Sequence, residues 1–279
     1  MKLKFTKMQG CGNDYLYINC FENVLKHPEQ VSKILSDRHF GVGGDGIILI
    51  CPSETADAKM RIFNQDGSEG KMCGNGIRCV GKYLYDTGMV KKTELNVETL
   101  SGIKTLRLFL KGDTMDSVAV DMGKAELTPE KIPVKLEGER IIGVPVKIDG
   151  ILWRITCVSM GNPHCVVFCS DVDGLDLPAL GPSFENNSLF PERVNTEFVQ
   201  VIDSHTIKRR VWERGSGETW ACGTGACAAA VASVLNGFCE KNQEITVHLR
   251  GGDLKILDRG DTVIMTGEAR TVFTGEAEL

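Results

Sequence analysis

The chain has 279 residues, of which 42% are hydrophobic and 25% are charged, and its formal net charge is −5. This length suits one large domain or two domains of about 100–150 residues each. The mild acidity excludes the basic surface typical of nucleic-acid binding, and no stretch approaches the ~20 apolar residues of a membrane-spanning helix. The first residues also lack the apolar core of a signal peptide. We therefore expect a cytoplasmic protein with no nucleic-acid or membrane partner.

The first half of the chain combines predicted helices and strands. Residues 28–38 place apolar side chains at helical spacing behind a proline suited to a first turn. A second helix is predicted over 76–86, because these residues follow the stretch MCGNGIRC (72–79) and stop at a Thr-Gly pair. The segments 105–113 and 117–123 alternate apolar and polar residues, which predicts strands.

The second half shows a similar mixture. Residues 143–150, 244–261 and 262–267 predict strands and hairpins bounded by glycine-containing turns. Residues 171–187 (DVDGLDLPALGPSFENN) indicate a long surface loop. Residues 225–235 (GACAAAVASVL) predict a helix that is apolar or small on every face, and such a helix is normally buried all round. We expect it to run through the middle of a curled sheet.

The eleven cysteines favour a reducing compartment. Their number is odd, no two of them are separated by two residues, and the closest pair is Cys165 and Cys169. This spacing argues against a disulfide framework and against a zinc site, so we expect free thiols and no metal. A cysteine-rich metal-binding scaffold is the non-catalytic alternative, which a metal analysis would test.

Two Cys-Gly-x-Gly stretches, at Cys73 and Cys222, are 149 residues apart (222 − 73). The same offset relates three further pairs of positions. Gly12 corresponds to Gly161, Asn13 to Asn162, and Asn64 to Glu213. The repeated offset predicts two similarly built halves related by a pseudo-twofold axis. In that arrangement the two cysteines face each other over a cleft.

Each of these cysteines lies at, or just before, the first turn of a predicted helix. Unpaired backbone N–H groups and the helix dipole favour negative charge there, so we expect the thiol pKa to fall below its usual ~8.5 and the helix end to bind an anion. An amino acid held by its carboxylate between the two sulfurs could lose its α-proton to one and receive a proton from the other. The α-carbon would then be inverted. The remaining cysteines are interpreted as small buried residues.

Six segments in chain order resemble the diaminopimelate epimerase family, which belongs to the cofactor-independent racemases together with proline racemase. They are MQGCGNDY (8–15), DRHFGVGGDG (37–46), FNQDGSEGKMCGNGIRC (63–79), VSMGNPHCV (158–166), FPERVNTEF (190–198) and ERGSGETWACGTGACAA (213–229). The resemblance implies a mixed α/β fold with two pseudo-symmetric halves, each a curled mixed β-sheet around a central helix, and an active site in the cleft between them. We expect residues 1–116, completed by a strand over 268–279, to form the first half and residues 117–267 the second.

The resemblance also implies an activity and its residues. The reaction is epimerisation of LL-2,6-diaminopimelate to the meso isomer, without a cofactor or metal, by a homodimer. Cys73 and Cys222 are the acid–base pair, and His164 and Glu213 assist them. Together with Glu213, five side chains hold the remote ammonium and carboxylate of the substrate. These side chains are Asn13, Asn64, Asn162, Asn195 and Arg214. The backbone amides of Gly74, Asn75, Gly223 and Thr224 bind the carboxylate at the reacting end.

One position departs from the family pattern, because some members have a pocket glutamine where this chain has Gly46. Gly41–Gly46 (GVGGDG) also matches the glycine pattern of dinucleotide-binding folds, but it follows a predicted helix and precedes a strand, the reverse of what that mechanism needs. A pyridoxal-phosphate racemase would require a Schiff-base lysine beside a phosphate site, which no segment suggests. Proline racemase is the alternative substrate class, and Arg214 with several asparagines favours a longer substrate that has a second charged end.

Overall fold

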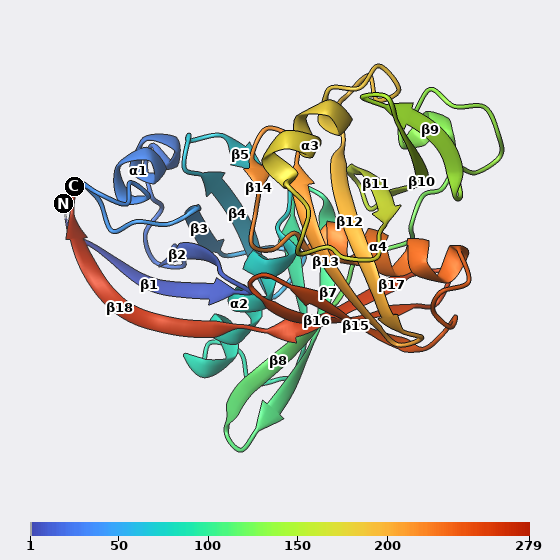
Figure 1. Cartoon of the computed structure of the whole chain (residues 1–279). Coiled ribbons are helices and arrows are strands. Elements are labelled where there is room, and N and C mark those ends of the chain that lie inside the picture. Colours follow the sequence, from blue (N-terminus) through green and yellow to red (C-terminus); the bar gives the residue numbers. More distant parts are fainter. Residues whose placement is uncertain (1) are drawn as a thin grey trace. The chain divides into compact units, whose positions relative to one another are not determined.

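The computed structural model describes residues 2–279 (Figure 1). The chain divides into two compact units. The first comprises the residues up to Asp121 together with Thr266–Leu279, and the second is Met122–Met265. Strand β17 (Val263–Glu268) contains the point at which the chain returns from the second unit to the first.

The first unit is a mixed sheet with two helices, α1 (Pro28–Leu35) and α2 (Gly74–Asp86). Its strands are β1 (Lys2–Gly10), β2 (Asn13–Asn19), β3 (Gly46–Cys51), β4 (Ala58–Asn64), β5 (Glu69–Gly70), β6 (Glu94–Thr99), β7 (Gly102–Lys111), β8 (Thr114–Asp121) and β18 (Arg270–Glu278). Pairing gives the order β18-β1-β2-β3-β4-β6-β7-β8, in which β2–β3 and β4–β6 are parallel and the other pairs antiparallel. The short β5 pairs with the end of β4.

The second unit contains a short 3₁₀ turn, η1 (Pro129–Lys131), and the helices α3 (Leu177–Glu185) and α4 (Gly223–Leu235). Its strands are β9 (Val144–Ile148), β10 (Ile151–Ser159), β11 (Pro163–Phe168), β12 (Asn195–Asp203), β13 (Thr206–Glu213), β14 (Gly217–Glu218), β15 (Glu244–Leu249) and β16 (Gly252–Asp258). The order is β9-β10-β11-β12-β13-β15-β16, with β11–β12 and β13–β15 parallel and the other pairs antiparallel. The short β14 pairs with the end of β13.

The two units repeat one design, and the predicted architecture of two similar halves is confirmed. The series of parallel and antiparallel pairings from β1 to β7 recurs from β10 to β16. The helices α2 and α4 have the same length, and both their first and their last residues are 149 positions apart. The offset found at the cysteines therefore holds over whole elements.

A buried helix lies at the centre of each unit. Every residue of α4 from Gly225 to Ser233 is buried, and the helix contacts β10, β11, β12, β13, β15 and β16. Its alanines and glycines let the strands approach the helix backbone from all sides. The helix α2 lies similarly against β1, β2, β7, β8 and β18. The predicted central helix in a curled sheet is confirmed.

Two predictions of secondary structure are wrong in part. The stretch 171–187 is not a loop throughout, because it contains α3. This helix starts where the Asp176 side chain accepts a hydrogen bond from the Ala179 N–H (3.2 Å), and it buries Leu177, Gly181 and Phe184, which have helical spacing. Gly181 and the adjacent proline made the segment resemble a loop, but the glycine is needed because a Cβ there would lie 2.1 Å from the Trp212 ring.

The helix boundaries also differ from the predicted ones. The first helix ends at Leu35 rather than at residue 38. The helices α2 and α4 each begin two residues earlier than predicted, at Gly74 and Gly223, so that the preceding cysteine is the N-cap residue in both. The predicted strands over 105–113, 117–123, 143–150, 244–261 and 262–267 are present as β7, β8, β9, β15–β16 and β17.

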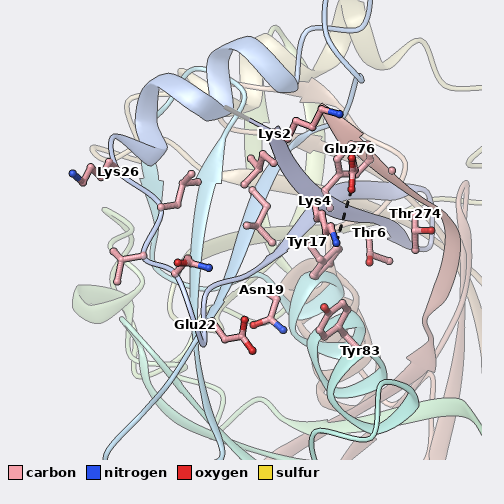
Figure 2. A pocket seen from close by; sticks show the side chains of 17 residues that line it. Lys2, Lys4, Thr6, Tyr17, Asn19, Glu22, Lys26, Tyr83, Thr274 and Glu276 are labelled. Atoms are coloured by element: carbon pink, nitrogen blue, oxygen red, sulfur yellow. Dashed lines mark ion pairs between the residues drawn. The ribbon is translucent and has the colours of Figure 1, made fainter. Parts of the chain in front are cut away.

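A pocket of about 1,060 Å³ opens in the first unit beside β1, β2 and β18 (Figure 2). Lysines, tyrosines and the segment 22–26 line it, and Lys4 pairs with Glu276 across its wall (3.9 Å). None of the site residues predicted from the sequence lines this pocket.

Replacing Gly181 by alanine tests whether α3 needs a glycine against Trp212. A Cβ in contact with a rigid ring costs about 1–3 kcal/mol, which outweighs the ~1 kcal/mol that alanine gains over glycine in a helix. We expect Gly181→Ala to lower the melting temperature by up to about 8 °C. The matched control is Gly81→Ala in α2, where the new Cβ meets a flexible Leu106 methyl at 2.9 Å. Equal melting temperatures for the two variants would contradict this reading of α3.

Candidate active site

Cys73 is held at the start of α2 by its own helix and by β2. It has an extended backbone (φ −135°, ψ 116°) and caps the helix, since its Sγ accepts a hydrogen bond from the Gly76 N–H at 3.3 Å. The thiol in turn donates to Asn13 Oδ1 at 3.3 Å. Asn13 is fixed from the other side because its Nδ2 donates to Asp45 Oδ2 (2.7 Å). The sulfur is thus positioned by two secondary-structure elements.

Two further residues predicted from the sequence lie in the first unit. Asn75 lies beside Cys73, and Asn64 lies on β4 opposite β3. Asn75, in the first turn of α2, is buried and donates from Nδ2 to Asn13 Oδ1 at 3.5 Å, so the structure brings Asn13, Cys73 and Asn75 together. Asn64 ends β4 and donates to Ser68 Oγ at 3.0 Å within its own turn. Its register partner is Gly46, the position that departs from the family pattern. A Cβ at Gly46 would lie 2.1 Å from the Phe63 carbonyl oxygen, so this backbone leaves no room for a glutamine.

Cys222 occupies the equivalent place at the start of α4. Its backbone is also extended (φ −126°, ψ 110°), its side chain is buried, and its Sγ lies 3.4 Å from Thr224 Oγ1. The first N–H groups of a helix have no partner within the helix. The amides of Gly223 and Thr224, like those of Gly74 and Asn75, are therefore placed to bind an anion.

His164 lies on β11 and is fully buried. Its Nδ1 is 2.9 Å from Glu197 Oε1, and its Nε2 is 3.0 Å from Asn162 Oδ1. The two predicted residues His164 and Asn162 are thus in direct contact, and the histidine is oriented by a carboxylate that the sequence analysis did not identify.

Two buried charged residues that contact these side chains were not predicted from the sequence. They are Glu197 on β12, beside His164, and Arg209 on β13, beside the Cys222 backbone. Arg209 Nη1 donates to Glu197 Oε2, and Nη2 donates to the backbone carbonyl of Cys222. Both side chains are at most 2% exposed. A signal was present, because Arg209 alternates with two apolar residues on the inward face of β13, where a charged residue is rarely buried without a partner.

Glu213, Asn195 and Arg214 lie around the end of β13. Burial raises the pKa of the Glu213 carboxyl, while a hydrogen bond from the Thr219 hydroxyl acts in the opposite direction. Asn195 Oδ1 accepts from the Arg214 N–H (2.9 Å), and Arg214 Nη1 donates to the Glu192 carbonyl (2.9 Å). The Asn195 side chain is therefore linked to the backbone of Arg214.

The expectation that both thiols have a lowered pKa is wrong for Cys222. Burial raises the pKa of its thiol well above the usual value, and the nearby carboxylates of Glu213 and Glu197 raise it further. The Arg209 charge and the Thr224 hydrogen bond oppose this without reversing it. Burial and the neighbouring carboxylates therefore outweigh the helix end and favour the protonated form of the Cys222 thiol.

All eleven cysteines are present as thiols. Among residues 2–279, no three or more His, Cys, Asp and Glu side chains are grouped so as to hold a metal ion. Within the same residues, no helix has both the length and the apolar character needed to cross a membrane.

The effect of Glu213 on Cys222 can be measured by alkylation. Glu213→Gln removes a negative charge, so the pKa of Cys222 should fall and iodoacetamide should modify this thiol at lower pH than in the parent protein. Mass spectrometry of the Cys222 peptide over a pH series gives the midpoint. Glu218→Gln, which removes a carboxylate paired with Arg210, serves as the control and should leave the midpoint in place. An unchanged or higher midpoint in Glu213→Gln would contradict the stated cause.

The chain is similar to known proteins over nearly its whole length. The family model of diaminopimelate epimerase matches residues 5–128 and 156–272. A diaminopimelate epimerase of Acetivibrio thermocellus is 56% identical over 279 residues, which cover 99% of each chain, and one of Agathobacter rectalis is 53% identical over 99% of this chain and 100% of its own. Among solved structures, a probable proline racemase from Agrobacterium radiobacter K84 shares the fold, with a TM-score of 0.73 and 16% identity over 99% of this chain and 93% of that one. The chain belongs to the diaminopimelate epimerase family.

Proposed function

We propose that this protein is an isomerase that inverts one α-carbon of LL-2,6-diaminopimelate to give the meso isomer, for lysine and peptidoglycan precursor synthesis. The observation that carries the proposal is the pair of cysteines at equivalent positions of two similar units, each of which is the N-cap residue of a central helix. Membership of the family, with relatives of this name at 53–56% identity over nearly the whole chain, supports the same reaction.

The carboxylate at the reacting end binds to the first turns of the two helices. The amides of Gly74, Asn75, Gly223 and Thr224 supply hydrogen bonds there, and the helix dipoles add partial positive charge. When the α-proton leaves, negative charge spreads onto the carboxylate. Donors aimed at that charge typically lower the barrier by a few kcal/mol each. The acidity of the α-carbon is therefore raised without a cofactor.

The two thiols move the protons on opposite faces of the α-carbon. The raised pKa of Cys222 supports its role as the proton donor in the direction from LL to meso, which leaves Cys73 to remove the α-proton. The hydrogen bonds that Cys73 makes to the Gly76 N–H and to Asn13 fix its sulfur for this step. His164 and Glu213 assist by setting the polarity around the reacting centre.

The remote end of the substrate is held by Asn13, Asn64, Asn162, Asn195, Glu213 and Arg214. A guanidinium binds a carboxylate through two parallel hydrogen bonds, and a carboxylate or amide oxygen accepts from an ammonium. The Asn195–Arg214 contact supports a preformed place for that second charged group. Proline has no such group, so an assay of α-hydrogen exchange on diaminopimelate and on proline separates this function from proline racemase activity. Exchange on proline alone would overturn the proposed substrate.

We infer further that the enzyme is a cytoplasmic homodimer, as the resemblance of its sequence to the family implies. Cysteines held as thiols suit a reducing compartment. On β18, Val272 and Phe273 are 57% and 46% exposed, which is consistent with a covered face in an assembly. Light scattering on the purified protein distinguishes a dimer from a monomer.

Alanine substitution of single cysteines separates chemistry from packing. Cys73→Ala and Cys222→Ala should each reduce inversion by at least 10²–10⁴-fold, because a positioned acid or base typically contributes about that much. Cys79→Ala and Cys227→Ala remove thiols that lie inside the same helices and should lose less than about tenfold. Steady-state rates with LL-diaminopimelate give the comparison, and similar losses at all four positions would show that the two N-cap thiols act only in packing.

Deuterated water tests the use of two separate groups. Thiol hydrogens exchange rapidly with solvent, so the donor cysteine delivers deuterium while the other cysteine retains the proton it has removed. Product formed early from LL-diaminopimelate should therefore contain deuterium at the inverted carbon, and unreacted substrate should stay largely protiated. Mass spectrometry of both species measures this. Product that keeps the original α-hydrogen would refute the assignment of Cys73 and Cys222 as opposed base and acid.

A further inference from the structure

Three buried side chains of the second unit form a continuous series of hydrogen bonds across adjacent strands. Arg209 on β13 contacts Glu197 on β12, and Glu197 contacts His164 on β11. All three are at most 2% exposed. The series ends on one side at the carbonyl of Cys222 and on the other at Asn162.

We propose that Glu197 is a positioning residue for the reaction, because its carboxylate accepts a hydrogen bond from the His164 Nδ1–H and turns Nε2 toward the side-chain amide of Asn162, whose NH2 group is the donor that a neutral Nε2 needs. Arg209 pairs with Glu197 and ties it to the first turn of α4. The inference rests on the proposed function for its link to catalysis. Glu197 itself touches neither the substrate nor the reacting atoms.

Strand register explains how the three side chains meet. His164 pairs with Asn195 in the parallel β11–β12 ladder, and Val166 pairs with Glu197, so His164 and Glu197 are diagonal neighbours on one face of the sheet. Arg209 pairs with Val199 in the antiparallel β12–β13 ladder and is the next diagonal neighbour. Side chains two residues apart on a strand share a face. The face is the one that α4 covers.

The start of α4 is shaped to receive this carboxylate. A Cβ at Gly225 would lie 2.2 Å from Glu197 Oε1, so the glycine of the second Cys-Gly-x-Gly stretch makes room for the glutamate. The equivalent glycine of the first stretch, Gly76, instead faces an Ile48 methyl at 2.6 Å. The same glycine thus serves a charged network in one unit and apolar packing in the other.

Stability alone gives a weak reason to keep such a network. Burying two charges costs several kcal/mol each before pairing, and replacing a buried ion pair by apolar side chains of similar volume is often neutral or stabilising. Arg209 Nε also has no hydrogen-bond partner among the described residues. A histidine whose Nδ1–H is fixed by a carboxylate, by contrast, has a defined tautomer and orientation, which acid–base sites require.

The network is also electrically coupled to the groups around it. Besides His164, four titratable or charged side chains face Glu197. They are Arg209, Glu213, Cys165 and Cys222. The Glu197 charge raises the pKa of the Cys222 thiol and of the Glu213 carboxyl, and Arg209 opposes both effects.

Nitrogen NMR of labelled histidine tests the pairing in the full-length enzyme. The chain has five histidines, and the His164 signal is identified by its loss in His164→Gln. We expect the parent protein to show the Nδ1-protonated form. In Glu197→Gln this form should give way to a mixture of tautomers, and kcat should fall by about 10–100-fold while KM changes little, since substrate contacts are kept.

Glu185→Gln is the matched control, because Glu185 is also a buried carboxylate of this unit and accepts from Trp212 Nε1 at 2.8 Å. This variant should leave the His164 tautomer as in the parent. If Glu197→Gln does not fold, Glu197→Asp withdraws the carboxylate by one methylene and should give an intermediate loss of the Nδ1-protonated form.

Two results would overturn the proposal. One is an unchanged His164 tautomer in the Glu197 variants, and the other is a changed tautomer with kcat no lower than in Glu185→Gln. The NMR measurement needs no substrate, so it tests the Glu197–His164 pairing even if diaminopimelate is not turned over. Absence of turnover by the parent protein would instead count against the proposed function.

Discussion

Complete burial of a helix inside a single curled sheet is the constraint on which the rest of the molecule depends. The helix α4, which strands surround, has only alanine, glycine, cysteine, valine and serine along its buried length. Packing from all sides fixes the axis of the helix and the position of its first turn. A cysteine placed at the N-cap then has a defined backbone and a nearby set of unpaired amides. The position of the first helical residue therefore fixes the places of the thiol and of these amides.

The two units use this design for different purposes. Cys73 caps its helix through a hydrogen bond from Gly76 and is linked to Asn13, whereas Cys222 lies among carboxylates that favour its protonated form. At the position equivalent to Gly46 in the first unit, the second unit has Asn195, which accepts from the backbone of Arg214. The repeated fold therefore supplies two similar helix ends, and divergence of the strands beside them gives each end its own polar partners.

Most of this architecture could be predicted from the sequence because it depends on local patterns. A shared offset between two cysteine stretches identified the repeat, and the all-round apolar segment 225–235 identified the central helix. The parts that could not be predicted depend on contacts between distant residues. Gly181 and its neighbouring proline are typical of a loop, so the sequence did not predict α3. The need for a glycine there arises only because Trp212 packs on the helix. The pairing of Glu197 with Arg209 and the raised pKa of Cys222 arise from burial that no local pattern records.

The pairing of β18 with β1 has a consequence for the order of folding. Lys2 lies opposite Glu278 in this antiparallel ladder, so the first unit contains both ends of the described chain (Figure 1). The second unit is continuous in sequence, from Met122 to Met265. During synthesis the second unit therefore has all of its strands before the first unit has β18. Until β18 is made, β1 is paired with β2 on one side only and presents an unpaired strand edge on the other.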